Sequence, residues 1–370
     1  MNPNFIDIPK KYKLLLHSDK MRIVFIGGGI STISLLCYFI REENSWFKAH
    51  NWLILEKREQ IGIGEQIGIG DLGNYKIRSN SVLPAFRSII PPGIRLDPLL
   101  KNILDNVGND FVPLGLVSEM MSGIATSILK QYSNVIAKTN SNVIAVENNV
   151  VVLENERIES GCIIIAAGGT QQIPSEYIHC RNVLTSTDVL SNSHDFTNKR
   201  IAIVGASHSA WSVVWTLLQD YRKPVVSIDI YSRNKTRVFF RSTTAATLEN
   251  YDYNDDDICS ETNQIHRFGG LRGDSKQVWR NHRNGLHPNI NHHIAKTIPW
   301  DLLDKYDYVV VAYNYRRRKI PGGENCINFG FMSNIPLETG EKSFKGSKDG
   351  IWLYSNDLAK IISEKIMNKV

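Results

Sequence analysis

One stretch near the start of the chain, RIVFIGGGISTISLLCYFI (22–40), constrains the fold more than any other. It begins with a β-branched and aromatic run that is typical of a buried strand in a parallel sheet. Three consecutive glycines interrupt the run, and an apolar, helix-like stretch follows from Ile30. The stretch carries no charge after Arg22, but its glycines and hydroxyl side chains make it a poor membrane-spanning helix. We therefore predict a strand, a tight turn and a helix, with no membrane insertion.

A strand, a glycine turn and a helix in this order are what a dinucleotide-binding βαβ unit requires. The first glycine permits the tight turn, the second lets the backbone approach a pyrophosphate, and the helix offers free N–H groups at its start. The third glycine position holds Thr32. The next predicted strand, NWLILEK (51–57), ends in Glu56, whose carboxylate can accept hydrogen bonds from both hydroxyls of an adenosine ribose. The first predicted nucleotide site comprises Gly27, Gly29, Ile30, Ser31, Glu56 and Lys57.

A second segment, KRIAIVGASHSAWSVVWTLL (199–218), repeats the order of strand, turn and helix. Its glycine pattern is weaker, because Ser207 and Ala210 stand at the second and third glycine positions. After the following strand comes Arg233 in place of an acid, with Lys235 close by. A cation here suits the 2′-phosphate of NADP, which an acid would repel; a solvated strand end is the alternative. The second predicted nucleotide site comprises Gly205, Ser207, His208, Ser209 and Arg233.

Two nucleotide-binding units in one chain favour a flavin paired with a nicotinamide, because hydride must pass from one ring to the other. After the first unit, the segment LEKREQIGIGEQIGIGDLGNYKIRSNS (55–81) contains IGIG twice. Its glycines, Gly62 and Gly64 among them, remove side chains and allow the backbone to approach a ligand closely. A glycine-rich surface loop is the alternative interpretation.

In the order and spacing of these elements, which span residues 22–365, the chain resembles flavoproteins with two dinucleotide-binding domains. The particular resemblance is to the flavin-containing and N-hydroxylating monooxygenases. It implies that GGGIST and Glu56 hold FAD, with Gly62 and Gly64 along the cofactor. It also implies that GASHSA holds the pyrophosphate of NADPH and that AAGG, with Gly168, is the crossover between the domains.

Two further segments carry the resemblance and depart from it in places. The segment DYVVVAYNYRRRKIP (307–321) resembles the family's D-x-x-x-x-A-T-G-Y element, but Tyr313 and Asn314 stand where Thr and Gly are usual. Near the C-terminus, DGIWLYSNDLAKII resembles the last FAD-contacting strand, which implies that Asp357 reaches the ribityl chain. Asn356 stands there in place of the customary glycine.

The tract YKIRSNSVLPAF (75–86) resembles the part of flavin monooxygenases that carries an asparagine beside the reactive face of the flavin. The resemblance implies that Asn80, followed by Ser81, holds the nicotinamide carboxamide and hydrogen-bonds a peroxide on the flavin, since an amide both donates and accepts. Tyr75 and Arg78 are expected to shape the same pocket. A turn role for Asn80 and a core role for Tyr75 are the alternatives.

The expected fold class is α/β, with two Rossmann-like dinucleotide-binding domains and the NAD(P)H domain inserted into the FAD domain. The expected division comprises an N-terminal extension (1–20), the first part of the FAD-binding domain (21–195), the NADPH-binding domain (196–318) and the return segment of the FAD-binding domain (319–370). The segment 239–297 resembles nothing familiar, and its arginines are candidates for a carboxylated substrate, for the phosphates of NADPH or for solvated loop charges.

The predicted function is that of an FAD-dependent, NADPH-consuming monooxygenase of a small molecule. The resemblance favours an amine or amino-acid-like substrate and N-hydroxylation through a flavin hydroperoxide, chemistry that needs no protein nucleophile. Many Baeyer-Villiger and flavin-containing monooxygenases carry an F-x-G-x-x-x-H element that is missing here, which leaves the N-hydroxylating type or an unassigned branch. Two alternatives stay open: an NAD(P)H-dependent flavin oxidoreductase with a quinone or protein acceptor, and a degenerate, non-catalytic nucleotide-binding flavoprotein.

Composition and charge argue against several other classes of protein. The five cysteines are scattered and never form C-x-x-C, which argues against a disulfide relay and fits a reducing, cytoplasmic compartment. The formal charge of +6 is modest, and no nucleic-acid-binding signature accompanies it. The histidines between positions 266 and 293 follow no metal-ligand spacing. The expected partners are a small-molecule substrate and molecular oxygen, without nucleic acid or a metal ion; a homo-oligomer stays open.

Overall fold

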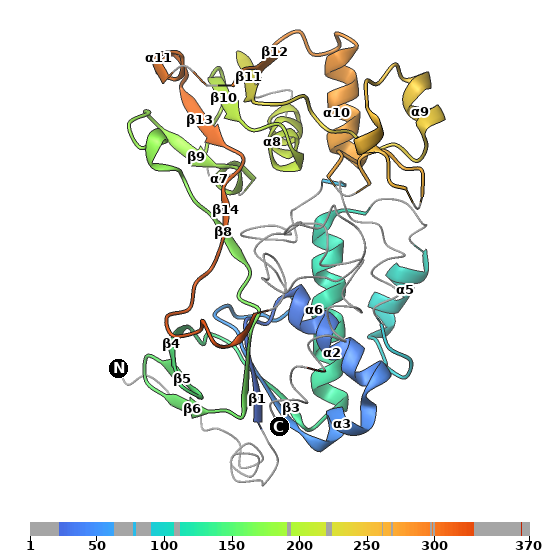
Figure 1. The fold of residues 1–370 in the computed structure, drawn as a ribbon, viewed down its shortest axis with the longest axis vertical. Helices are drawn as coiled ribbons and strands as arrows, with labels where there is room; N and C mark the ends of the chain where they lie inside the picture. Colours follow the sequence, from blue (N-terminus) through green and yellow to red (C-terminus); the bar gives the residue numbers. More distant parts are fainter. Residues whose placement is uncertain are drawn as a thin grey trace.

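The computed structural model describes residues 22–62, 77–78, 90–106, 112–190, 194–219, 224–260, 262–267, 269–296, 298, 300–328 and 364 of the chain. Within these residues, two five-stranded sheets with their helices stand one above the other in the view of Figure 1. A pair of narrow strands crosses between the two sheets, and a small three-stranded sheet lies beside the lower one.

The first sheet has the strand order β15-β7-β1-β2-β3, and its strands pair in parallel. Its strands are β1 (Arg22–Ile26), β2 (Asn51–Leu55), β3 (Val135–Lys138), β7 (Cys162–Ile165) and β15 (Ile327–Asn328). The helices of this unit are α2 (Ile30–Glu42), α3 (Asn44–Ala49), α5 (Pro98–Asn106) and α6 (Leu114–Gln131). Strand β1 lies at the centre and is buried after its first residue, because a parallel sheet covered on both faces excludes water from its central strand.

The second sheet has the order β12-β11-β10-β13-β9, again in parallel. Its strands are β9 (Val183–Thr185), β10 (Arg200–Val204), β11 (Ser227–Ser232), β12 (Ile290–Ile294) and β13 (Tyr308–Val311). Its helices are α7 (Ser186–Leu190), α8 (His208–Leu218), α9 (Thr243–Leu248), α10 (Gly273–Arg283) and α11 (Trp300–Leu303). Short 3₁₀ turns lie at Ser175–Tyr177 and Asp255–Asp257.

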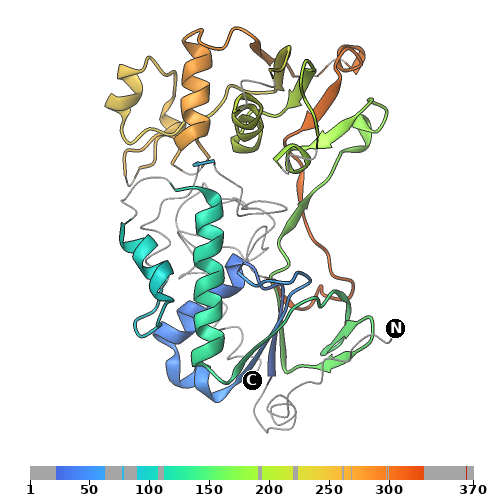
Figure 2. The same ribbon diagram turned by 180° about the vertical axis from the view of Figure 1, so that it is seen from behind.

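The chain leaves the first sheet after β7, forms the whole second sheet and returns to the first at β15. On the way out it forms β8 (Gly169–Gln171) and on the way back β14 (Tyr315–Arg317), which pair antiparallel. Figure 2 shows this two-stranded crossover from behind. The predicted α/β fold, with one Rossmann-like unit inserted into the other, is thus confirmed.

Each face of the first sheet is covered by a different partner. On one face α2 and α6 enclose a core in which the Phe25 ring stacks on Trp52 with centroids 5.9 Å apart. The other face packs against the antiparallel sheet of β4 (Val143–Glu147), β5 (Val150–Leu153) and β6 (Arg157–Glu159). Burying each large apolar side chain stabilises the fold by about 2 kcal/mol. Among the helices that the structure describes, none has the length and apolar composition needed to cross a membrane.

Candidate functional site: two glycine turns

The turn between β1 and α2 has room only for glycine at its first position. Gly27 has a φ of +102°, and its N–H donates to the Leu55 carbonyl at 2.8 Å. A Cβ on this residue would lie 2.5 Å from the Ala166 carbonyl oxygen. Helix α2 then begins at Ile30 with Gly29 as its N-cap, so no side chain of the cap residue covers the first N–H groups. A pyrophosphate needs this geometry at the start of a helix.

Thr32, at the third glycine position, fits the turn well. Its hydroxyl donates to the Gly27 carbonyl at 2.5 Å, and the residue is fully buried. A buried hydroxyl that keeps a hydrogen-bond partner carries little penalty. The threonine therefore leaves the predicted phosphate turn intact, and Ser31 lies beside it in the first turn of α2.

Glu56 follows β2 directly and points its carboxylate at the same turn. The residue is 6% exposed; Oε2 accepts from the Gly28 N–H at 2.7 Å, and Oε1 accepts from the Arg58 N–H at 3.0 Å. Each carboxylate oxygen can accept two hydrogen bonds, so both keep capacity for the hydroxyls of a ribose. Lys57, the next residue, is exposed. A buried carboxylate beside the glycine turn fits the adenosine end of FAD.

Gly62 is required by a protein contact. Its φ is +86°, its N–H donates to the Gly28 carbonyl at 2.7 Å, and a Cβ would lie 2.5 Å from the Ser122 nitrogen in α6. The glycine thus lets the chain pass between the first turn and α6. The other predicted residues of this region, Gly64, Tyr75, Asn80 and Ser81, lie outside the described residues, as does Asp357 near the C-terminus.

The turn between β10 and α8 repeats the geometry of the first turn. Gly205 has a φ of +119°, and its N–H donates to the Tyr231 carbonyl at 2.8 Å. The residue after β13 packs against this turn, because a Cβ on Gly205 would lie 3.2 Å from the Ala312 carbonyl oxygen. Ser207 is the N-cap of α8, and Ser209 lies in the first turn of the helix. Both predicted nucleotide turns therefore have one backbone design.

The two turns differ in the residue that comes directly after the carbonyl that closes each turn. The Gly27 N–H bonds Leu55 and the Gly205 N–H bonds Tyr231, so the residue equivalent to Glu56 is Ser232. The hydroxyl of Ser232 donates to the Asn234 carbonyl and lies 2.8 Å from His292 Nε2. Sequence reasoning missed this serine, although its place as the last residue of β11 could have identified it.

Arg233 is exposed directly after this serine. Burial raises the pKa of Tyr177 and of Tyr313, and the positive charge of Arg233 opposes that rise. Tyr313 follows β13, and its hydroxyl donates to that of Tyr177 at 3.2 Å. Arg233 therefore lies within electrostatic reach of the carboxyl end of β13. The second turn has a cation nearby where the first turn has a buried carboxylate.

His208 anchors a loop over the second turn. Its Nε2 lies 2.9 Å from the Gly270 carbonyl oxygen. Gly270 in turn packs so closely against the backbone of Phe239 that no Cβ would fit. The structure therefore places His208 at the predicted turn and gives it a contact within the protein.

Asn314 stands where the resembled family has glycine, and the backbone explains why it is tolerated. Its φ is +64°, and the φ of Gly168 is +68°. The two residues occupy equivalent places, each following an alanine and one further residue after β13 or β7. Asparagine adopts this left-handed conformation more readily than other side chains do. Both crossover strands therefore leave their sheets through the same bend.

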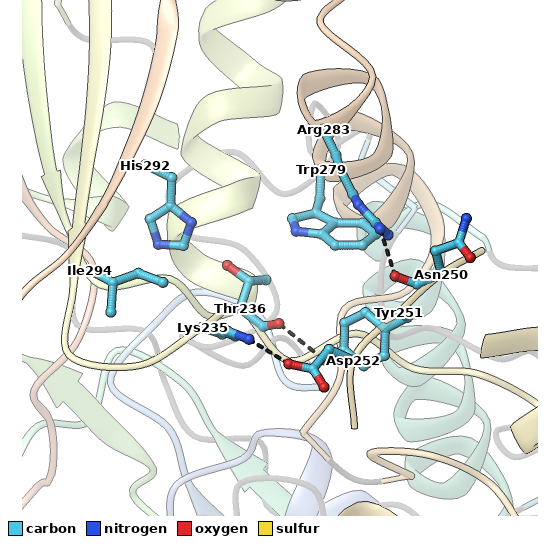
Figure 3. Close-up of a pocket in the computed structure, with 9 residues that line it drawn as sticks. All are labelled: Lys235, Thr236, Asn250, Tyr251, Asp252, Trp279, Arg283, His292 and Ile294. Atoms are coloured by element: carbon cyan, nitrogen blue, oxygen red, sulfur yellow. Dashed lines mark hydrogen bonds and ion pairs between the residues drawn. The ribbon is translucent and has the colours of Figure 1, made fainter. Parts of the chain in front are cut away.

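A cavity of about 260 Å³ lies at the carboxyl ends of β11 and β12, beneath α10 (Figure 3). It is lined by Lys235, Thr236, Asn250, Tyr251, Asp252, Trp279, Arg283, His292 and Ile294. Lys235 forms an ion pair with Asp252. Arg283 donates to the carbonyls of Glu249 and Asn250. The charged side chains that line the cavity are thus paired within the protein, and the lining indicates no particular ligand.

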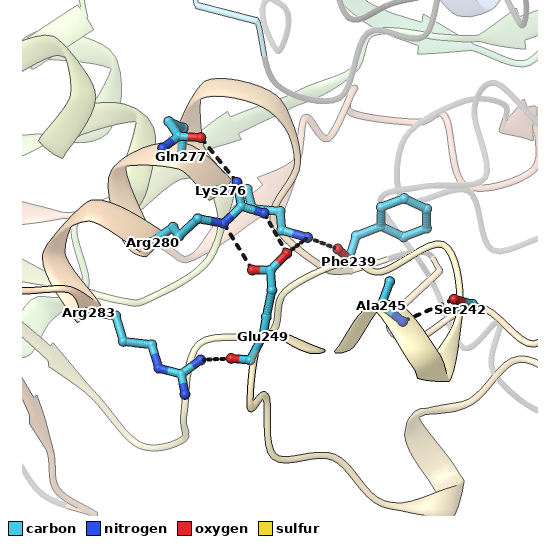
Figure 4. Close-up of polar contacts among 8 residues, drawn as sticks. All are labelled: Phe239, Ser242, Ala245, Glu249, Lys276, Gln277, Arg280 and Arg283. Carbon is cyan, nitrogen blue, oxygen red and sulfur yellow. Dashed lines mark hydrogen bonds and ion pairs between the residues drawn. The ribbon is translucent and has the colours of Figure 1, made fainter. Parts of the chain in front are cut away.

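Glu249 connects α9 to α10 in the unfamiliar segment (Figure 4). Arg280 donates to both carboxylate oxygens at 2.9 and 2.7 Å. The Lys276 ammonium lies 3.7 Å from the same carboxylate and 3.6 Å from the centre of the Phe240 ring. Burial lowers the pKa of Lys276 to about 8. Burial alone would raise the pKa of Glu249, but Arg280 and Lys276 outweigh it and hold that pKa below its ordinary value.

A Glu249→Gln variant is expected to unfold with about 2 kcal/mol less free energy at pH 7, because two charge-assisted hydrogen bonds are weakened. The native pKa of Glu249 is below its ordinary value of 4.5, so its stabilisation is present above that pH and is lost as the pH falls. Urea unfolding at pH 7 and in acid measures both effects. Asp252→Asn, which removes a largely exposed ion pair, should unfold at the same urea concentration as the wild type, because solvent screens such a pair. Equal losses of unfolding free energy in the two variants would contradict a stabilising role for the contacts of Glu249.

Arg78, predicted to shape the cofactor pocket, contacts Asp274 at the start of α10. The arginines of the unfamiliar segment also have protein partners, as Arg280 and Arg283 show. Among the residues that the structure describes, His, Cys, Asp and Glu side chains form no group of three or more suited to a metal ion.

The fold and its two glycine turns define a chain with two Rossmann-like units, one inserted into the other. A family model described as L-lysine 6-monooxygenase/L-ornithine 5-monooxygenase matches residues 130–277. The resemblance to N-hydroxylating, FAD- and NADPH-dependent monooxygenases is thereby confirmed. The matched stretch covers the outgoing crossover strand β8, the second glycine turn and the loop to α10.

Individual relatives are distant in sequence. The CMP-5′-(3-aminopropyl)phosphonate hydroxylase of Streptomyces rubellomurinus is 23% identical over an alignment 215 positions long that covers 45% of this chain and 49% of that protein. The chain thus spans about half the length of the curated relative it matches. The L-lysine 6-monooxygenase of Pseudomonas syringae has a TM-score of 0.59 at 12% identity, covering 95% of this chain and 100% of the other. The ornithine N-hydroxylase of Kutzneria sp. 744, solved with reduced FAD, NADP⁺ and L-ornithine, has a TM-score of 0.51 at 16% identity, covering 80% and 81%.

Proposed function

We propose that the protein is an FAD- and NADPH-dependent monooxygenase that hydroxylates the nitrogen of a small primary amine. The observation that carries the proposal is the pair of equivalent turns, one beside a buried carboxylate, Glu56, and the other beside Ser232 and Arg233. The difference suits two different dinucleotides, because a carboxylate accepts ribose hydroxyls and a cation binds a 2′-phosphate. The family-model match supports the same activity.

FAD fits the first turn. Gly27, Gly29, Ile30 and Ser31 would hold its pyrophosphate at the start of α2, and Glu56 would accept its ribose hydroxyls. When bound, FAD supplies the acceptor for hydride from NADPH and the means of activating molecular oxygen. Lys57, Gly62, Gly64, Tyr75, Arg78 and Asp357 are proposed as further FAD-binding residues, and Asn80 and Ser81 as the catalytic pair.

NADPH fits the second turn. Gly205, Ser207, His208 and Ser209 would hold its pyrophosphate at the start of α8, and Arg233 would bind its 2′-phosphate. The absence of a carboxylate at Ser232 removes the repulsion that an acid would exert on that phosphate. Gly168 and Asn314 would set the crossover between the two sites.

An Arg233→Ala variant is expected to raise the KM for NADPH about 30-fold, because an exposed charge-assisted contact to a phosphate is lost. The KM for NADH should change less than threefold, since NADH lacks the 2′-phosphate. Steady-state oxidation of both nucleotides by the same preparation measures the ratio. A parallel increase for both would show that Arg233 acts on folding or on the shared part of the nucleotide.

The substrate class is inferred from chemistry shared by the relatives. The names of these relatives specify lysine, ornithine and CMP-5′-(3-aminopropyl)phosphonate, each of which carries a primary amine on a short alkyl chain. The proposed substrate is therefore a primary alkylamine. The panel of amines described below tests which acidic group it carries at its other end.

The function is tested by incubating purified protein with FAD, NADPH, oxygen and a panel of primary amines that includes lysine, ornithine and aminopropylphosphonate. Formation of a hydroxylamine, in step with NADPH oxidation, would support the proposal. Rapid reduction of a quinone or dye without hydroxylamine would indicate the electron-transfer alternative. Protein that takes up no FAD would indicate the non-catalytic alternative.

The division of the chain is also a proposal. We propose an extension at 1–20, FAD-binding parts at 21–195 and 319–370, and an NADPH-binding domain at 196–318, with β9 and α7 from the end of the first part joining the second sheet. Limited proteolysis near positions 196 and 318 with mass analysis tests these limits. The scattered cysteines support a reducing, cytoplasmic location, and gel filtration would test for a homo-oligomer.

A further inference from the structure

Arg78 and Asp274 join the two units away from the crossover strands. The Arg78 N–H donates to Asp274 Oδ2 at 2.7 Å, and the Asp274 N–H donates to the Arg78 carbonyl at 2.6 Å. The guanidinium adds a bond from Nη2 to Asp274 Oδ1 at 3.0 Å. These bonds, here called the Arg78–Asp274 clasp, hold the backbone at position 78 as well as its side chain.

Asp274 is built into the start of α10. It lies in the first helical turn, where a carboxylate interacts favourably with the helix dipole. Its side chain is 14% exposed, against 59% for Arg78. In both ribbon views the start of α10 faces the first unit. A shielded carboxylate that accepts a main-chain N–H and a guanidinium forms a stronger contact than an exposed ion pair does.

Helix α10 is tied in turn to the second glycine turn. His208, the first residue of α8, reaches the Gly270 carbonyl, four residues before Asp274, at 2.9 Å. The buried hydroxyls of Ser212 in α8 and Ser275 in α10 lie 3.5 Å apart. The position of Asp274 is therefore set by the elements that carry the proposed NADPH turn.

We propose that Asp274 is a positioning residue that holds the Arg78 segment in register with the second nucleotide turn. The inference rests on the proposed function, since Asn80, two residues beyond Arg78, is the residue proposed to serve the flavin reaction. Through the clasp, the second unit holds the backbone at position 78. The clasp thus couples the proposed NADPH unit to the step in which oxygen either hydroxylates the amine or leaves as hydrogen peroxide.

Two balanced reactions distinguish an intact Arg78–Asp274 clasp from a broken one. In coupled turnover, NADPH, a proton, O2 and the amine give NADP⁺, water and the hydroxylamine. In uncoupled turnover, NADPH, a proton and O2 give NADP⁺ and hydrogen peroxide. Loss of the clasp should shift turnover to the second reaction, because small displacements of reacting groups sharply reduce productive geometry.

The test compares Asp274→Ala and Asp274→Asn in the full-length protein. Hydrogen exchange at the Arg78 amide, which does not depend on activity, should be about tenfold faster in Asp274→Ala. Asp274→Asn should show a smaller increase, because its side-chain oxygen still accepts that N–H. Peroxide released per NADPH should rise about threefold or more in Asp274→Ala. Asp105→Ala, which removes a carboxylate that pairs with Lys101 within α5, should match the wild type in both measurements.

Unchanged exchange at Arg78 in Asp274→Ala would overturn the clasp, and faster exchange with an unchanged peroxide ratio would overturn its positioning role. If Asp274→Ala does not fold, Asp274→Asn and Arg78→Ala carry the test with the same two measurements. If the wild type hydroxylates no amine, the proposed function fails separately. Anaerobic flavin reduction by NADPH then decides the inference: a rate in Asp274→Ala that falls tenfold supports it, and an unchanged rate overturns it.

Discussion

A Gly27→Ala variant is expected to retain no FAD and to lose about 3 kcal/mol or more of unfolding free energy. The added Cβ would lie 2.5 Å from the Ala166 carbonyl oxygen while φ stays at +102°. Neither Gly27 nor the Ala166 carbonyl can move away, because they directly follow β1 and β7, which are paired strands of the first sheet. The flavin content of the purified protein and its urea unfolding curve measure the two effects.

Gly93→Ala is the matched control for this variant. Gly93 also has a positive φ, +88°, but a Cβ there meets nothing within 4 Å. Its cost should be about 1 kcal/mol from the backbone conformation alone, with flavin content unchanged. If Gly27→Ala behaved like this control, the steric argument for the first turn would be wrong.

A Glu56→Gln variant is expected to bind FAD about 100-fold more weakly, which corresponds to roughly 2.7 kcal/mol. An amide has one oxygen, whereas the carboxylate of Glu56 accepts the Gly28 N–H on one oxygen and the Arg58 N–H on the other. The NH₂ group would face one of these donors, which would lose its acceptor, and a ribose hydroxyl would lose a charged partner. Titration of the flavin-free protein with FAD, followed by fluorescence, measures the change in Kd.

Glu59→Gln serves as the control, because it makes the same chemical change three residues away on an exposed side chain. Its Kd for FAD should stay within about twofold of the wild type. A similar weakening in both variants would indicate that overall charge, and not the buried carboxylate, governs binding.

The two glycine turns could be predicted from the sequence because each is local. Residues 22–40 and 199–218 each contain a buried strand pattern, a glycine and a helical pattern within twenty residues, and short-range sterics decide how such a segment folds. The carboxylate of Glu56 was predicted for the same reason, since it ends the next strand along the chain. Thr32 and Asn314 departed from the expected pattern, but a hydroxyl and a left-handed asparagine fill the same backbone places.

Contacts between distant segments could not be predicted in this way. Ser232 was recognised as the counterpart of Glu56 only when the hydrogen bonds of Gly27 and Gly205 were compared across two sheets. The internal partners of Arg280 and Arg283 became visible only once α9 and α10 were packed together. The contact of Arg78 with Asp274, 196 residues further along the chain, is likewise visible only in the folded structure.

The sequence by itself therefore determined the α/β class, the two glycine turns and the resemblance to a family of monooxygenases, because these depend on neighbours in the chain. Tertiary structure alone decided which carbonyl closes each turn, where the charges of the inserted unit find partners, and how α10 meets the first unit. The physical reason is that glycine requirements and strand burial are local, whereas the partner of a charged side chain depends on which distant backbone folding brings within hydrogen-bond reach.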